Sequence, residues 1–166
     1  MLSKKNQPIM IIRSVVPTRD IGFLPGTLEE KIAVYEQPYQ SLCSELFNLK
    51  NAYSELKKRG FVDFSTTSFL RGLTFHNTTI VVDECQNLNW SEMDTIMTRC
   101  GDGCRIIFCG DFRQTDLNKQ DERAGLTKFM NVVKSMKSFE FVEFNREDIC
   151  RSELVKEYIN AKLNFN

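Results

Sequence analysis

Two apolar runs, each followed at once by acidic and amide residues, constrain the fold of this chain more than any other feature. The two stretches read TIVVDECQN at positions 79–87 and RIIFCGDFRQ at positions 105–114. Short runs rich in branched apolar residues are typical of the buried strands of a parallel sheet. Ligands of such sheets collect beyond the carboxyl ends of the strands. The residues expected at these ends are Asp83, Glu84, Gln86, Gly110, Asp111 and Gln114.

The rest of the sequence alternates between strand-like and helix-like patterns. Further strands are predicted at 7–15, 61–66 and 139–144, and helices are predicted at 28–59, 91–99, 126–136 and 152–163. In the first helix, Pro38 is expected to kink or divide the helix, and Gly60 is expected to end it. Strands that alternate with helices predict an α/β fold, with a parallel sheet that has helices on both faces.

Length and composition predict one domain that spans residues 1–166. The chain has 166 residues, of which 42% are hydrophobic, which suffices for one core and is too few for two ordinary domains. Lys+Arg and Asp+Glu both number 22, so the formal charge is zero and a strongly basic nucleic-acid footprint is absent. The apolar runs are far shorter than the roughly 20 residues that cross a bilayer. We therefore expect no membrane span and a cytoplasmic location.

Six cysteines and one histidine raise the question of a metal site. Cys100, Cys104 and Cys109 are the closest set, but their spacing matches neither a zinc ribbon nor a Cys/His finger. His76 has no second histidine to pair with. Free thiols in a reducing compartment account for the cysteines, and His76 is expected to have a structural role in a loop.

The residues after the two runs suit phosphoryl transfer. Asp83 could hold a magnesium ion directly or through water, and Glu84 could orient or deprotonate the attacking water. Gly110 would let the backbone approach a nucleotide, and the amide of Gln114 could read the terminal phosphate. Either motif alone could simply begin a loop. Together, with a predicted helix between them, they predict a nucleoside triphosphate site.

A metal-dependent nuclease is a second interpretation of the same residues. Asp83, Glu84, Asp111 and Asp116 could gather around one or two magnesium ions, because such ions prefer carboxylate oxygens. This interpretation leaves the two glutamines without a role. The nucleotide interpretation gives both of them one.

Four segments of the chain carry a family resemblance. They are IIRSVVPTRDIGFLPGTLEEK (Ile11–Lys31), SFLRGLTFHNTTIVVDECQN (Ser68–Asn87), TRCGDGCRIIFCGDFRQTDL (Thr98–Leu117) and FVEFNREDICRSELVKEYI (Phe141–Ile159). In this order they resemble the PhoH-like phosphate-starvation ATPases, and the bacteriophage branch in particular. The resemblance implies a RecA-like core related to superfamily-one helicases, ATP hydrolysis with Mg²⁺ and a role in RNA metabolism, in the host cytoplasm if a phage encodes the chain.

The resemblance also implies roles for single residues. Asp83 and Glu84 would be the magnesium and catalytic-water pair, with Gln114 as the phosphate sensor. Arg151 resembles a late arginine that would reach a phosphate, across a subunit boundary in a ring, because its planar fork suits phosphate oxygens. A surface ion pair near a helix start is the alternative for Arg151.

Other residues are candidates for contact with nucleic acid. Arg13, Arg19 and Arg71 are expected on loops that face nucleic acid or nucleotide in the resembled family. Phe23 and Trp90 could stack on bases. Packing beneath a loop or helix is the alternative for both aromatic residues.

The sequence departs from the resembled family in one respect. No segment has the form Gly, four residues, Gly-Lys-Ser/Thr, which is the loop that grips phosphates. In the family, a strand, this loop and a helix precede the segment that begins at Gln7, so we expect an N-terminally truncated domain. Alone, it would bind ATP and Mg²⁺ weakly or not at all. The missing strand would lie between strands 105–109 and 139–144 and would expose two sheet edges.

The missing strand and loop could be compensated in several ways. A separate polypeptide could supply the phosphate loop, the flanking strands could pair directly, the chain could self-associate, or the fold could stay partial. The chain would then be an ATPase that is inactive in isolation. The alternative is a catalytically inactive interaction or nucleic-acid-binding protein that docks on a full-length homologue, with RNA or single-stranded nucleic acid as a candidate ligand.

Overall fold

Strands and helices alternate in the part of the chain that the computed structural model describes, which is residues 7–14, 28–111 and 120–164. This part divides into two compact units, Met1–Asn131 and Val132–Asn166. No helix among the described residues is long and apolar enough to cross a membrane. The first unit contains the sheet and the acidic residues, so it defines the candidate site.

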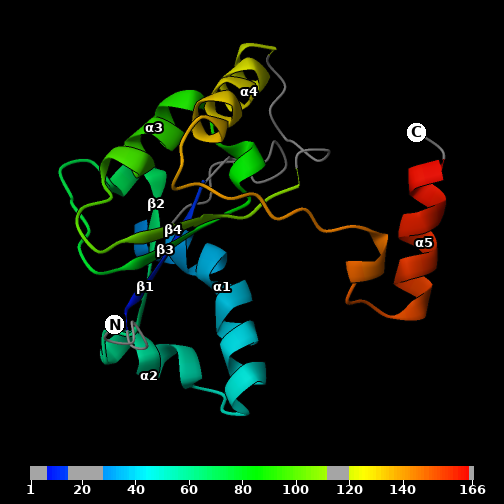
Figure 1. Ribbon diagram of the computed structural model, residues 1–166. Helices are drawn as coiled ribbons and strands as arrows, with labels where there is room; N and C mark the ends of the chain where they lie inside the picture. The colour runs from blue at the N-terminus through cyan, green and yellow to red at the C-terminus, as the bar shows by residue number, and fades with distance from the viewer. Residues whose placement is uncertain (1–6, 15–27, 112–119, 165–166) are drawn as a thin grey trace. The chain divides into compact units, whose positions relative to one another are not determined.

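Four parallel strands form the sheet, in the order β2-β1-β3-β4 (Figure 1). They are β1 (Ile9–Arg13), β2 (Val62–Thr66), β3 (Thr79–Asp83) and β4 (Arg105–Phe108). The register pairs Arg13 at the end of β1 with Asp83 at the end of β3. The predicted α/β fold with a parallel sheet is therefore confirmed. The carboxyl ends of β1, β3 and β4 lie at the same end of the sheet.

Helices cover both faces of the sheet (Figure 1). On one face lie α1 (Leu28–Phe47) and α2 (Ala52–Lys58), and on the other lie α3 (Trp90–Thr98) and α4 (Gln120–Lys134). A core cluster joins the first face to its helices. Its buried members are Ile11, Tyr53, Val62 and Phe64, and Ile32, Tyr35, Tyr39, Cys43 and Leu56 pack against them.

The first predicted helix is two helices, and the division does not fall at Pro38. Pro38 lies inside α1, and the chain turns instead after Phe47, where Asn48 adopts a left-handed φ of 49°. Pro38 is exposed, whereas the neighbouring Tyr39 packs on the core cluster, so tertiary packing holds α1 together across the proline. The prediction that Gly60 ends the helical stretch agrees with its φ of 71°, just after α2.

The second unit contains the largest difference from the predicted elements. Residues 139–144 were expected to form the last strand, but they form none, and α5 (Glu153–Asn164) follows a short 3₁₀ turn, Arg146–Asp148. Phe141, Val142 and Phe144 are exposed. A strand needs a neighbour that satisfies its backbone groups, and the described chain offers none to this segment. Direct pairing of the flanking strands is therefore not observed among the described residues.

Candidate functional site

Asp83 and Arg13 face each other across neighbouring strands. Paired residues of adjacent strands point to the same face of the sheet, so the register brings their side chains together. The Arg13 guanidinium lies 3.9 Å from Asp83 Oδ2 and 3.9 Å from Glu84 Oε1. The three side chains are between 26% and 42% exposed, so a ligand can reach them. One arginine thus lies between the predicted magnesium ligand, Asp83, and the predicted catalytic carboxylate, Glu84.

Tyr39 provides a second contact to Asp83. Its hydroxyl donates a hydrogen bond of 2.5 Å to Asp83 Oδ2 from α1, which crosses the same face. Burial, and then the hydrogen bond and the negative charge of Asp83, raise the pKa of Tyr39, so it remains a donor at neutral pH. The sequence prediction missed this contact. The signal was present, because a half-buried tyrosine in an apolar stripe needs a polar partner.

Gln86 connects the two predicted motifs. It is 3% exposed, its amide nitrogen donates to Glu84 Oε2 at 2.6 Å, and its carbonyl oxygen accepts from the Asp111 backbone N–H at 3.2 Å. Glu84 has a φ of 51°, the left-handed region that costs a residue with a Cβ on the order of 1 kcal/mol. The backbone therefore turns sharply at Glu84, and Gln86 fastens that turn to the loop after β4.

Gly110 allows these two loops to approach closely. A Cβ at this position would lie 2.4 Å from Gln86 Oε1 and 2.8 Å from Cys85 Sγ. The backbones also pair here, because the Cys85 N–H donates to the Cys109 carbonyl at 2.9 Å. The predicted role for Gly110 was approach to a nucleotide. Within the chain itself, the missing side chain makes room for Gln86 and Cys85.

The thiols near the site are poor nucleophiles. All six cysteines are free. Burial raises the pKa of Cys85 to about 12, with the neighbouring Cys109 as the next cause. Burial and then Asp83 raise the pKa of Cys109. Both thiols therefore remain protonated at neutral pH, as expected for structural cysteines.

Glu92 organises the neighbouring loops. Asn89 and Glu92 form a reciprocal capping box at the start of α3. The carboxylate of Glu92 also accepts hydrogen bonds from Thr67 Oγ1 at 2.6 Å and Ser14 Oγ at 3.4 Å. One side chain thus ties α3 to the ends of β1 and β2. This role is structural, because Glu92 contacts the neighbouring loops and the start of its own helix.

The other predicted residues fall into two groups. Gln114, Arg19 and Phe23 lie outside the described residues. Arg71 is exposed in a turn after a 3₁₀ helix at Thr67–Phe69. Arg151 is exposed and belongs to the second unit. The roles expected for these residues remain predictions.

Trp90 has a partner within the protein. Its ring lies 6.5 Å from that of Phe129 in an edge-on arrangement, and the Lys128 ammonium lies 4.4 Å from its centroid. Phe129 is buried and also contacts Phe108 of β4, at 5.0 Å between centroids. Trp90 therefore joins α3 to α4, which favours the packing alternative over base stacking.

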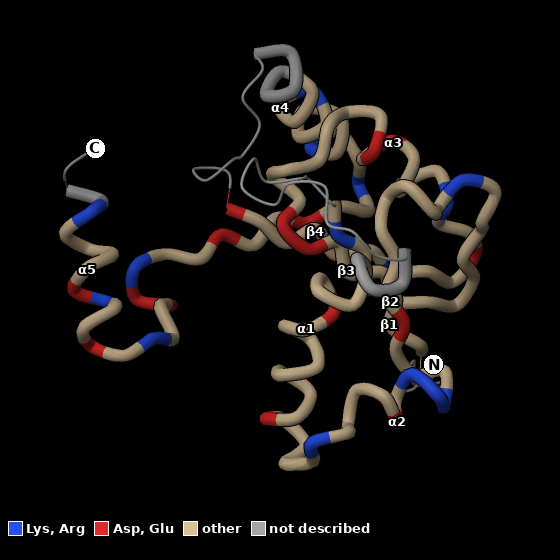
Figure 2. The backbone as a smooth tube through the Cα atoms, turned by 180° about the vertical axis from the view of Figure 1, so that it is seen from behind, with Lys and Arg blue, Asp and Glu red and all other residues tan. Residues whose placement is uncertain are grey.

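Acidic positions lie near the ends of β3 and β4, whereas both signs of charge occur along the rest of the backbone (Figure 2). Among the described residues, no three His, Cys, Asp or Glu side chains gather as a cage for a metal ion would require. Magnesium in nucleotide sites needs less, because one or two carboxylates act together with water and phosphate oxygens. The donor set around Asp83 fits magnesium bound with a nucleotide. Asp116, the fourth carboxylate of the nuclease interpretation, lies outside the described residues.

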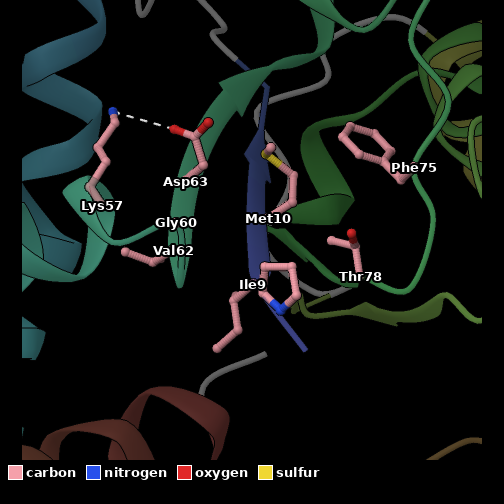
Figure 3. A pocket seen from close by; sticks show the side chains of 9 residues that line it. Ile9, Met10, Lys57, Gly60, Val62, Asp63, Phe75 and Thr78 are labelled. Carbon is pink, nitrogen blue, oxygen red and sulfur yellow. Dashed lines mark ion pairs between the residues drawn. The ribbon is translucent and has the colours of Figure 1, made fainter. Parts of the chain in front are cut away.

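A pocket of about 430 Å³ lies at the opposite end of the sheet (Figure 3). Ile9 and Val62, at the start of their strands, line it together with Met10, Phe75 and Thr78, and Lys57 pairs with Asp63 at 3.5 Å on its wall. Ligands of parallel sheets gather at the carboxyl ends. This pocket is at the amino ends and is separate from the candidate site.

A four-stranded parallel sheet with helices on both faces, and acidic residues at the carboxyl ends of its strands, defines an α/β domain consistent with the RecA-like nucleotide-binding class. The sequence model of the PhoH-like protein family matches residues 1–162. The chain belongs to the PhoH-like protein family.

Individual relatives agree with this assignment. The chain is 31% identical to Protein PhoH of Escherichia coli K12 over 163 residues, which cover 97% of this chain and 46% of that protein. It is 28% identical to a PhoH-like protein of Synechocystis over 162 residues, or 97% and 49% of the two chains. A PhoH-like protein of Bacillus subtilis is 29% identical over 154 residues, or 92% and 48%. The chain spans about half the length of these curated relatives.

Proposed function

We propose that this chain provides the carboxylate and sensor half of an ATP-hydrolysing site. The observation that carries the proposal is the connection of Glu84 through Gln86 to the backbone of Asp111, beside Asp83. In this proposal Asp83 holds the magnesium ion of the nucleotide, and Glu84 orients the attacking water as a general base. Magnesium would neutralise charge on the phosphates. Gln114 would sense the terminal phosphate, and Arg151 would contact it.

The phosphate-binding loop would come from another polypeptide segment. The sequence contains no Gly, four residues, Gly-Lys-Ser/Thr pattern. β4 has β3 as its only partner among the described strands, and Ile107 on β4 is 42% exposed. An unpaired edge with apolar side chains favours a partner strand. We therefore infer that a different polypeptide segment, which carries such a loop, completes the sheet beside β4 and supplies the loop.

The test combines this chain with a separately produced polypeptide that carries a phosphate-binding loop from a full-length PhoH-like relative. Phosphate release with Mg²⁺ and ATP should exceed the sum of the two separate chains. Glu84→Gln should lower that rate on the order of 100-fold, because general-base catalysis contributes about that much or more. Glu45→Gln, at an exposed position of α1, should leave the rate unchanged.

The outcome also separates the two candidate functions. A mixture without turnover above that of the loop polypeptide would overturn the ATPase proposal. If the chains nevertheless bind each other, the catalytically inactive docking protein becomes the supported function. Turnover that Glu84→Gln does not change would assign hydrolysis to the loop polypeptide alone.

A role in RNA metabolism follows as the finer part of the proposal. Phe69 is 43% exposed and Arg71 is exposed two residues later. An aromatic ring beside an arginine suits single-stranded RNA, because the ring stacks on bases and the guanidinium contacts phosphates. Fluorescence anisotropy of a labelled single-stranded RNA should show binding at low salt that Arg71→Ala weakens. Unaltered binding would remove Arg71 from the RNA contact.

A further inference from the structure

Arg13 lies beside the two carboxylates that would bind a metal ion in the proposed hydrolysis site. Its backbone is the register partner of Asp83, and its guanidinium is 3.9 Å from oxygens of both Asp83 and Glu84. Two adjacent carboxylates repel each other, and the repulsion is strongest where water is partly excluded. The arginine offsets that repulsion while no other cation is bound.

Asp83 has a charged neighbour, Arg13, and an uncharged one, Tyr39. Tyr39 donates a hydrogen bond of 2.5 Å to Asp83 Oδ2, and this neutral donor adds no charge. A divalent cation bound to Asp83 would not be repelled by Tyr39, but it would be repelled by the guanidinium. A bound magnesium ion approaches a carboxylate oxygen to about 2 Å, so the ion and Arg13 would lie within roughly 6 Å of each other. Like charges at that distance favour the departure of one of them.

We propose that Arg13 is an internal counter-ion of the Asp83–Glu84 pair, which leaves the pair when a divalent metal ion binds. Tyr39 keeps its hydrogen bond and holds Asp83 in place during the exchange. The inference rests on the proposed function in assigning metal binding to this pair. It adds a residue that restrains metal binding until nucleotide phosphates contribute further ligands.

Metal binding by the intact chain without nucleotide tests this role directly. The probe is Mn²⁺ alone, and the readout is free Mn²⁺ measured by electron paramagnetic resonance. Arg13→Gln should tighten Mn²⁺ binding at least about tenfold, because the competing charge is gone. Arg13→Lys keeps the charge and should stay within about threefold of the wild type. The matched control is Arg59→Gln, which removes the same charge from an exposed position at the end of α2 and should change nothing.

A double variant tests whether Asp83 is the ligand responsible for the tighter Mn²⁺ binding of Arg13→Gln. Asp83→Asn in the Arg13→Gln background should abolish the added affinity, because Asp83 is the proposed ligand. If Arg13→Gln destabilises the fold in circular dichroism, Arg13→Met tests the same loss of charge with an unbranched side chain. Equal affinity of the wild type and the neutral variants would overturn the counter-ion role. An equal gain in Arg59→Gln would also overturn it, as an effect of net charge.

The result is independent of turnover. Unchanged Mn²⁺ binding together with intact ATP hydrolysis would remove the role of Arg13 and leave the proposed function standing. Tighter Mn²⁺ binding together with absent hydrolysis in the completed mixture would keep the counter-ion and remove the ATPase.

Discussion

β3 and β4 have similar sequences and very different surroundings. Both are short apolar runs, but Ile80 and Val82 of β3 are fully buried, whereas their register partners Ile106 and Phe108 of β4 are only partly buried. β3 has a strand on each side, and β4 ends the described sheet. An apolar strand pattern therefore shows which side chains a strand is able to bury. The elements next to the strand determine which of those side chains are buried.

The largest effect is expected at the centre of β3. Ile80→Ala removes a fully buried side chain and should lower the free energy of unfolding by about 3 kcal/mol. Urea denaturation of the intact chain measures it. If Ile80→Ala lowers the free energy of unfolding no more than Ile107→Ala in β4 does, the contrast between the two strands is contradicted.

The second largest effect is expected at Gly110, where the loops after β3 and β4 meet. Gly110→Ala would place a methyl group 2.4 Å from Gln86 Oε1 and should cost about 2 kcal/mol through displacement of Gln86. Thermal unfolding followed by circular dichroism measures this loss. Stability equal to that of the wild type would mean that the loops after β3 and β4 move apart without cost.

Tyr39 tests how firmly the end of β3 is held. Tyr39→Phe removes the hydrogen bond to Asp83 and should cost about 1 kcal/mol at neutral pH in urea denaturation. Tyr35→Phe, on the same helix and packed on the same cluster, is the control.

Alkaline pH gives this change a second readout. Because the pKa of Tyr39 is raised in the folded chain, its contribution is complete below the ordinary tyrosine pKa of about 10 and declines as the pH rises above that value. Wild-type stability should therefore fall more steeply above this pH than that of Tyr39→Phe. Parallel curves for the two chains would show that Tyr39 ionises as freely in the folded as in the unfolded state.

The smallest effect is expected on β4. Ile107→Ala, at a half-exposed edge position, should lower the free energy of unfolding by less than about 1 kcal/mol in the isolated chain. Adding the completing partner should enlarge that cost, because the side chain would then be buried. A cost that stays the same with the partner bound would place the partner elsewhere.

The sequence allowed the fold class and the acidic half of the site to be predicted, because both depend on local patterns. Apolar runs predicted β1, β3 and β4, and the helix predicted at 91–99 is observed as α3. The failures concern long-range neighbours. Residues 139–144 have the pattern of a strand without a described partner, and Pro38 is tolerated because α1 packs on the sheet around it.

The contacts of Arg13 and Tyr39 could not be read from spacing. The predicted strand 7–15 included Arg13, whereas the family resemblance placed Arg13 on a loop that faces nucleic acid or nucleotide. The structure places it at the end of β1 beside Asp83. That pairing depends on strand order, since β1 lies between β2 and β3 and not next to β4. Tyr39 reaches Asp83 only because α1 crosses the same face of the sheet. Order and crossing are properties of the assembled sheet.

The orientation of Gln86 has a consequence for communication across the sheet. Its donor end meets Glu84 and its acceptor end meets the backbone of Asp111, so turning the amide over would break both hydrogen bonds. Only one orientation of the amide therefore satisfies both neighbours. A single neutral side chain thereby couples the position of the turn after β3 to that of the loop after β4.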